Sequence, residues 1–125
     1  MEQETFNVKL TAGAALFNAG EYFEAHEVWE ELWMDCPSAD RRFVQALIQA
    51  AVAVYHFSRG NPAGATRLFQ SGKRYMEPYR PTRHGVDIDE FWRQMEAHLA
   101  PILMDAPESG PRPIIVLAPS PEGPL

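Results

Sequence analysis

The sequence predicts an all-α fold, a bundle of about five helices arranged as antiparallel hairpins. Glycine and proline cluster at a few places and leave long helix-favouring segments between them. No alternating run rich in valine, isoleucine and threonine occurs before residue 110, so no strands are expected in that part of the chain. The 125 residues, of which 46% are hydrophobic and 22% charged, fit one globular domain with its own core.

Two helices joined by a glycine turn are expected first. One covers about residues 5–18 and has apolar side chains at spacings of three and four, namely Phe6, Leu10, Ala14 and Phe17. Gly20 supplies the left-handed conformation that ends this helix. The second covers residues 22–35 and ends before Pro37, because the residue before a proline is pushed out of helical geometry.

The third predicted helix is the centre of the bundle. Ser38 is its expected N-cap, and the helix runs to about Arg59. Its middle is apolar on nearly every side, which is typical of a helix surrounded by others. The fourth helix starts at Pro62, is capped by Asn61 and reaches about Tyr75.

A loop and a fifth helix follow. Residues 78–86 contain two prolines, two arginines and a histidine, which predicts a basic loop. Asp87 followed by Glu90 resembles a capping box, and the amphipathic stripe after it predicts a helix that extends to Leu103.

The C-terminal part of the chain is predicted to be an extended tail. We place the helical bundle at residues 1–105 and a proline-rich tail at residues 106–125. The tail also contains the apolar run Ile114-Ile115-Val116-Leu117. We expect this run to lie extended against the bundle, because prolines rule out a helix there.

Charge and cysteine content exclude several functions. Eleven Lys and Arg against seventeen Asp and Glu give a net charge of -6, which argues against nucleic-acid and anionic-membrane partners, since both require a basic surface. The longest apolar stretch, residues 43–57, is interrupted by polar side chains and is shorter than the roughly 20 residues that span a membrane. A single cysteine, Cys36, and an acidic N-terminal sequence favour a cytoplasmic protein.

The second helix carries an unusual pair of residues. At about 100° per residue, His26 and Glu30 fall on one line, surrounded by Tyr22, Phe23, Trp29 and Trp33. An amphipathic helix normally keeps ionisable groups opposite its aromatic side chains, so this pair marks a candidate functional site. A buried carboxylate needs a partner, so we expect another helix to present a polar group to Glu30.

The third helix offers such groups. Gln45, Gln49 and His56 lie within about 40° of one another around its axis. If this stripe faces His26 and Glu30, a polar pocket lies between the second and third helices. If it faces water, it is the outer side of the third helix, and the sequence leaves both arrangements open.

The favoured hypothesis is a small cytoplasmic binding domain for a polar ligand. The imidazole of His26 and the carboxylate of Glu30 would anchor the ligand, and the side-chain amides of Gln45 and Gln49 would orient it. The aromatic rings of Tyr22, Trp29 and Trp33 would form the walls of the pocket.

Other functions remain open. A metal-dependent hydrolase would hold a divalent metal ion with His26, Glu30 and His56 and would use Glu27 as its general base. A tetratricopeptide-like adaptor for a protein partner would explain a weak repeat at an offset of 40 residues, although two similar hairpins in one bundle would also explain it. Five basic residues between positions 67 and 83, against six acids between 21 and 35, are compatible with a homo-oligomer or with an anionic partner, although a solvated surface also explains them.

Three blocks of the sequence resemble a known family. They are Phe17–Trp33, Phe43–Ala51 and Gly60–Ala65, and the resemblance spans about residues 6–77. Together they are similar to the bacterial and archaeal family called domain of unknown function 309. The resemblance implies a small all-α bundle but no activity, and the family motif falls on Asn18, His26, Glu27, Glu30, Trp33, Gln45 and Gln49. Trp29 departs from the motif, in which leucine is commoner.

Overall fold

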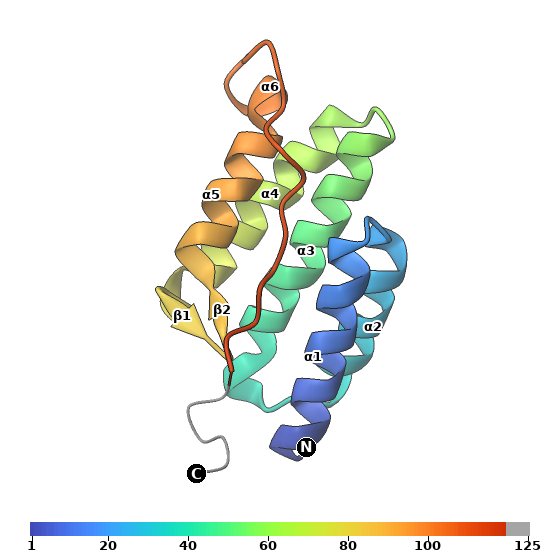
Figure 1. Ribbon diagram of the computed structural model, residues 1–125, viewed down its shortest axis with the longest axis vertical. Coiled ribbons are helices and arrows are strands. Elements are labelled where there is room, and N and C mark those ends of the chain that lie inside the picture. The colour runs from blue at the N-terminus through green and yellow to red at the C-terminus, as the bar shows by residue number, and fades with distance from the viewer. Residues whose placement is uncertain (120–125) are drawn as a thin grey trace.

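A computed structural model describes residues 1–119. Its regular elements, in chain order, are α1 (Gln3–Asn18), α2 (Tyr22–Asp35), α3 (Arg41–Ser58), α4 (Pro62–Met76), β1 (Thr82–Arg83), β2 (Val86–Asp87), α5 (Ile88–His98) and α6 (Ala100–Leu103). Single 3-10 turns at Ser38–Asp40 and Glu77–Tyr79 precede α3 and β1. The all-α bundle is confirmed (Figure 1). No helix in this part of the chain is long and apolar enough to cross a membrane.

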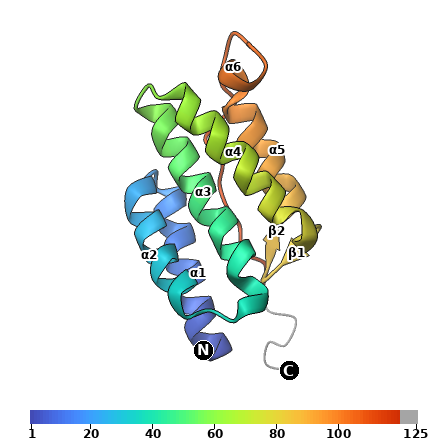
Figure 2. The ribbon, with the colours of Figure 1, turned by 180° about the vertical axis from the view of Figure 1, so that it is seen from behind.

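The central position of α3 is confirmed as well. Figure 2 shows α3 between the α1–α2 hairpin and the α4–α5 layer. Its buried side chains point in several directions around the axis: Phe43, Val44, Ala46, Leu47, Ala50, Ala51, Ala53 and Val54. Four alanines in this set keep the side chains short, which lets the neighbouring helices approach closely.

Two predicted caps are present, and one is not. The Asn61 side chain accepts a hydrogen bond from the backbone N–H of Gly64 at 3.1 Å, and that of Asp87 accepts one from Glu90 at 3.1 Å. These bonds satisfy amides that the first turn of a helix leaves unpaired. Ser38 makes no capping bond, because residues 38–40 form the 3-10 turn and α3 begins only at Arg41.

The predicted fifth helix is broken in two. Pro101 has no N–H to give to the carbonyl oxygen of Ala97, so the α-helical ladder stops at this point. The Ala97 oxygen instead accepts the N–H of Gly110 at 2.8 Å. The chain therefore ends α5 at His98, makes the short helix α6 and reverses into the tail.

The predicted basic loop contains a β-hairpin. β1 and β2 pair antiparallel, and the two residues between them, His84 and Gly85, have φ of 50° and 80°. Positive φ at both central positions is the signature of a tight two-residue hairpin turn. The expectation of no strands before residue 110 is therefore wrong, because strands of only two residues show no periodicity in the sequence.

Candidate functional site

His26 and Glu30 of α2 do form a pair, but they lie where the helix meets solvent. His26 Nδ1 donates to the carbonyl oxygen of Phe23 at 2.5 Å, and His26 Nε2 lies 3.2 Å from Glu30 Oε1. The His26 side chain is 17% exposed, whereas that of Glu30 is 56% exposed. The expectation that Glu30 is buried and needs a partner from another helix is therefore wrong. This carboxylate is accessible to solvent and needs no buried partner.

The buried face of α2 is rotated away from the predicted line. Ala25, Trp29 and Leu32 are all fully buried, and Trp29 lies against α1 with its indole Nε1 donating to the carbonyl oxygen of Leu10 at 3.3 Å. Gly13 makes this approach possible, because a Cβ at this position would collide with the Trp29 ring. The buried face of α2 was predicted from the positions of its aromatic residues alone. Ala25 and Leu32 belong to the buried face as well, and they shift its centre away from His26 and Glu30.

The other residues predicted to form the site differ in burial and do not line one common pocket. Tyr22 is buried in the core, and Trp33 is half-buried under the guanidinium of Arg41, 3.8 Å from the ring centroid. Gln45 is half-buried on α3. Glu27 is exposed on α2.

Two members of the α3 stripe lie toward α4. A Cβ at Gly72 on α4 would sit 3.4 Å from the Cβ of Gln49, which places Gln49 at the α3–α4 contact. His56 Nδ1 lies 3.3 Å from the side-chain amide nitrogen of Asn61, in the turn that leads into α4. Gln49 and His56 therefore contact a different neighbour from the one that the pocket hypothesis assigned to them.

The predicted metal-binding triad is not assembled. Within residues 1–119, no three side chains of the His, Cys, Asp and Glu types come close enough to hold one metal ion. His26 and Glu30 pair with each other, whereas His56 contacts Asn61. Two ligands of one ion must lie within a few ångströms of each other, so His26, Glu30 and His56 do not form a three-ligand site.

A second polar cluster lies at the N-terminal end of α3. Asp40, in the turn before α3, is only 5% exposed and is the buried charged side chain among residues 1–119. Its Oδ1 accepts hydrogen bonds from Arg83 Nε at 3.0 Å, from Arg83 Nη2 at 2.7 Å and from His84 Nε2 at 2.9 Å. This cluster joins the turn before α3 to the hairpin.

The cluster keeps Asp40 ionised. Burial alone raises the pKa of the Asp40 carboxyl, but hydrogen bonds donated by His84 and Arg83, together with the positive charge of Arg83 and of the protonated form of His84, lower it further than burial raises it. The pKa of the Asp40 carboxyl is therefore below the ordinary value of an aspartate. At neutral pH the group is thus a carboxylate, and the three N–H groups around Oδ1 donate to it.

Aromatic rings fix the orientation of the His84 imidazole. The imidazole packs against Phe6 of α1, with ring centroids 4.3 Å apart, and against Phe43 of α3, at 5.5 Å. The hydroxyl of Tyr79 donates to the carbonyl oxygen of Ala39 at 2.7 Å and ties the start of the hairpin segment to the same turn. His84 is therefore held by packing on two sides and by Asp40 at Nε2.

A pocket of about 900 Å³ opens beside this cluster. Its walls come from the N-terminal half of α1, from the hairpin and from tail residues 116–119. The polar side chains that line it include Asn7, Thr11, Thr82, Arg83 and His84. His84 Nδ1 is 3.5 Å from the amide nitrogen of Gln3, which also lines the pocket, so this ring nitrogen is on the pocket side of the imidazole. We call this space the hairpin pocket.

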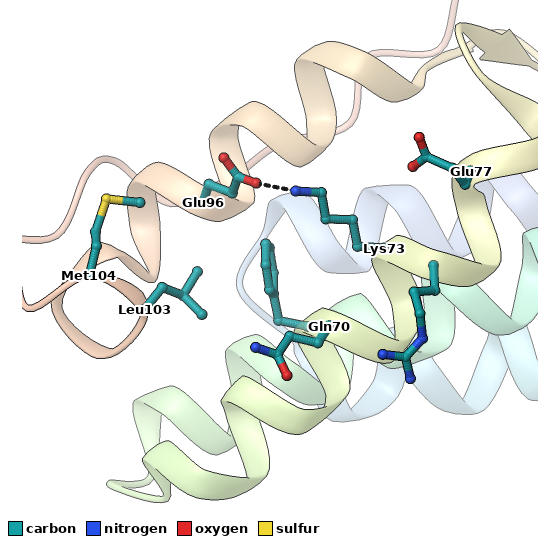
Figure 3. Close-up of a pocket in the computed structure, with 8 residues that line it drawn as sticks. Gln70, Lys73, Glu77, Glu96, Leu103 and Met104 are labelled. Atoms are coloured by element: carbon teal, nitrogen blue, oxygen red, sulfur yellow. Dashed lines mark hydrogen bonds and ion pairs between the residues drawn. The ribbon is translucent and has the colours of Figure 1, made fainter.

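Figure 3 shows another pocket, of about 930 Å³, between α4, α5 and α6. Leu103 and Met104 form its apolar end, and Lys73 bonds Glu96 across it at 2.7 Å. Glu77 at its other end pairs with Arg80 at 3.0 Å. Both acids of this pocket are thus paired with basic side chains, and Arg74 and Gln70 also line it.

The Asp40 cluster was not predictable from the sequence, because its members are distant in the chain. Asp40 precedes Arg83 and His84 by more than forty residues, and no periodicity links them. The available signal was the concentration of arginine and histidine in a short loop of an acidic protein. Such a loop requires a carboxylate partner when it packs against a core.

The fold and the site define a small helical bundle with a polar pocket at one end. Residues 10–68 match the model of the family described as "Domain of unknown function (DUF309)", so the resemblance predicted from the sequence is confirmed over these residues. The matched segment runs from α1 into α4 and includes Asp40, whereas Arg83 and His84 lie beyond it.

Two relatives extend this comparison. The uncharacterized protein YpuF of Bacillus subtilis (strain 168) is 45% identical over 70 residues, which cover 55% of this chain and 40% of YpuF. An uncharacterized protein of Aquifex aeolicus (strain VF5) is 26% identical over 81 residues, which cover 64% of this chain and 24% of that protein. The chain thus spans less than half the length of these relatives. Neither name states an activity, so function is argued from the site.

Proposed function

We propose that this chain is a binding module for a small, hydroxyl-bearing molecule, which it takes up in the hairpin pocket. The observation that carries the proposal is the buried Asp40 behind His84. A carboxylate accepts hydrogen bonds only, so the Nε2 atom of His84 carries the proton that lies between the two groups. In the neutral imidazole, Nδ1 then keeps a lone pair on the pocket side.

This arrangement suits a ligand that both donates and accepts hydrogen bonds. A ligand hydroxyl can donate to His84 Nδ1 by displacing the exposed Gln3 amide, which lies 3.5 Å from this atom, while the hydroxyl groups of Thr11 and Thr82 and the amide of Asn7 offer further bonds. Arg83 uses Nε and Nη2 for Asp40, and its Nη1 makes no hydrogen bond within residues 1–119. This Nη1 group can donate to a ligand oxygen.

The charge of the pocket favours a neutral ligand. Arg83 and Asp40 form an ion pair at 2.7 Å and largely cancel each other. The carboxylate of Asp87, which also lines the pocket, accepts the Glu90 N–H at the positive N-terminus of α5. A polyol or a sugar therefore fits these groups better than a multiply charged anion does.

The proposal keeps the polar binding module predicted from the sequence and moves its pocket. Arg83 and His84 replace His26, Glu30, Gln45 and Gln49 as the polar lining. The free thiol of Cys36 fits a cytoplasmic setting, where thiols stay reduced.

Amide NMR with neutral probes tests the proposal. Glycerol, D-ribose and D-glucose are titrated separately into the labelled chain, with citrate as the charged comparison. We expect saturable shifts at Thr82, His84 and Gly85 with at least one neutral probe. The matched variants are Thr11→Val, which removes a hydroxyl from the pocket, and Thr5→Val, an exposed threonine of the same helix outside it. Equal affinity in the two variants, or shifts confined to other regions, would count against the proposal.

A second candidate function, an adaptor for a basic helical segment, is favoured by the outer face of α2. Phe23 and Met34 are 48% and 72% exposed, and Glu27 and Glu30 lie between them on the same side of the helix. This function predicts that a helical lysine–leucine peptide shifts the amide resonances of α2. Phe23→Ser should weaken that binding without changing the charge, and an unchanged affinity would exclude this face.

A further inference from the structure

Residues 106–119 of the tail lie within the part of the chain that the structure describes, and residues 120–125 lie outside it. Figure 1 shows the described part of the tail running along the bundle between α1 and α5. Its side chains alternate, because Pro113 and Ile115 are buried while Ile114 and Val116 are 45% and 73% exposed. Such alternation with a period of two is the pattern of a strand with one face on the core.

Fixed side chains bind the backbone of the tail. The Asn18 amide donates to the carbonyl oxygen of Ile115 at 2.8 Å and accepts the Ile115 N–H at 2.7 Å. Gln94 Oε1 accepts the Ile114 N–H at 2.9 Å. Leu117 then forms an antiparallel bridge with Val86, so the tail extends the edge of the hairpin.

These contacts are those of a peptide-recognition site. Main-chain bonds at a strand edge give affinity for an extended segment, and pockets for alternate side chains give selectivity. Asn18, Gly85, Val86 and Gln94 supply the polar contacts, and a pocket for Ile115 supplies the apolar one. We call this set of residues the tail site.

The connection between α6 and the tail is exposed at its middle. Residues 107–109 are exposed, and Asp105 before them has φ of 55°, a left-handed conformation that aspartate adopts more readily than most residues. An exposed connection can extend without uncovering the core, so the segment that follows it can be exchanged between copies.

We infer that the tail site also accepts the tail of a second copy of this chain, so that two molecules exchange residues 106–119. The second copy is the fitting partner because its tail carries the same prolines, the same Ile115 and the same spacing as the segment already bound. In the exchanged dimer, residues 116–119 of the second copy complete the wall of the hairpin pocket. The inference goes beyond the proposed ligand and stands without it.

Two full-length variants with complementary defects test the exchange. Ile115→Asp disables the tail and leaves the tail site intact, whereas Asn18→Ala disables the site and leaves the tail intact. Only a mixture of the two contains a working tail together with a free working site. Native mass spectrometry of the mixture should show a 1:1 heterodimer, with each variant alone monomeric. A mixture that remains monomeric at all concentrations, with both variants folded by circular dichroism, overturns the inference.

A labelled peptide of residues 109–119 provides a second measurement that does not depend on Asn18→Ala folding. It should bind Ile115→Asp and fail to bind Val116→Asp, because Val116 is exposed and its substitution leaves the resident tail in place. Equal binding to both variants, or to neither, overturns the inference. Binding of the peptide to α2 rather than to α1 and α5, seen in amide shifts, overturns it as well.

Discussion

Replacement of Asp40 by asparagine removes the negative charge on which the hairpin is anchored. Three N–H groups of Arg83 and His84 donate to a single oxygen of this side chain. Asparagine has nearly the same shape and keeps an oxygen acceptor. The substitution therefore changes charge with little change in volume, and its effect reports on the ionic part of the cluster.

The expected cost follows from the number and exposure of these bonds. A hydrogen bond to a charged group contributes about 1 kcal/mol more than one between neutral groups. The bond from His84 counts in full because this side chain is 14% exposed, whereas the two from Arg83, which is 39% exposed, are weakened by solvent screening. We expect Asp40→Asn to reduce the free energy of unfolding by about 2 kcal/mol at neutral pH.

The loss of stability caused by Asp40→Asn should depend on pH. Because the folded-state pKa of Asp40 is depressed, its stabilisation is fully present above the unfolded pKa of about 3.9 and is lost as pH falls through the folded pKa. Urea denaturation followed by tryptophan fluorescence, at about pH 7 and about pH 3, should therefore show the cost of Asp40→Asn shrinking in acid.

The control is Asp35→Asn at the exposed end of α2. It should change the free energy of unfolding by less than about 0.5 kcal/mol at either pH. A cost of Asp40→Asn that is the same at both pH values, or no larger than that of the control, would refute the reasoning about the cluster.

Three further predictions concern packing and exposure. Gly13→Ala should destabilise the chain by about 2 kcal/mol in urea denaturation, because the new methyl group collides with Trp29, and Trp29→Leu in the same chain should recover part of that loss. Glu30→Gln should alter the free energy of unfolding by no more than about 0.5 kcal/mol, and a loss above about 2 kcal/mol would mean that the carboxylate is buried. Burial raises the pKa of the Cys36 thiol, so iodoacetamide should modify it slowly in the folded chain and quickly in urea, and equal rates would contradict its burial.

The helices were predictable because their signals are local. Spacings of three and four, the caps at Asn61 and Asp87 and the stop at Gly20 each depend on a few neighbouring residues, and the structure has these features. The break at Pro101 was missed because the apolar stripe continues through it into α6. In this case the missing amide hydrogen of proline outweighed the amphipathic pattern.

The site was less predictable than the fold because its contacts are non-local. The sequence brought His26 and Glu30 together correctly but gave no measure of how far α2 is rotated toward its neighbours. Asp40 has no pattern that assigns it to a hairpin more than forty residues away. A buried acid and a basic loop can be matched only once the topology places the turn before α3 beside the hairpin.

Asp40 fixes the proton of the neutral His84 ring at Nε2, so Nδ1 is the acceptor on the pocket side, where a ligand hydroxyl can replace the Gln3 amide. Long-range proton–nitrogen NMR of the imidazoles, with His84 assigned by its loss in His84→Gln, measures this directly. We expect a protonated Nε2 and an unprotonated Nδ1 in the neutral ring, and we expect the Nδ1 resonance to move on addition of the sugar or polyol that binds. A neutral His84 protonated at Nδ1, or an Nδ1 resonance unmoved by every probe that binds the chain, would contradict this expectation.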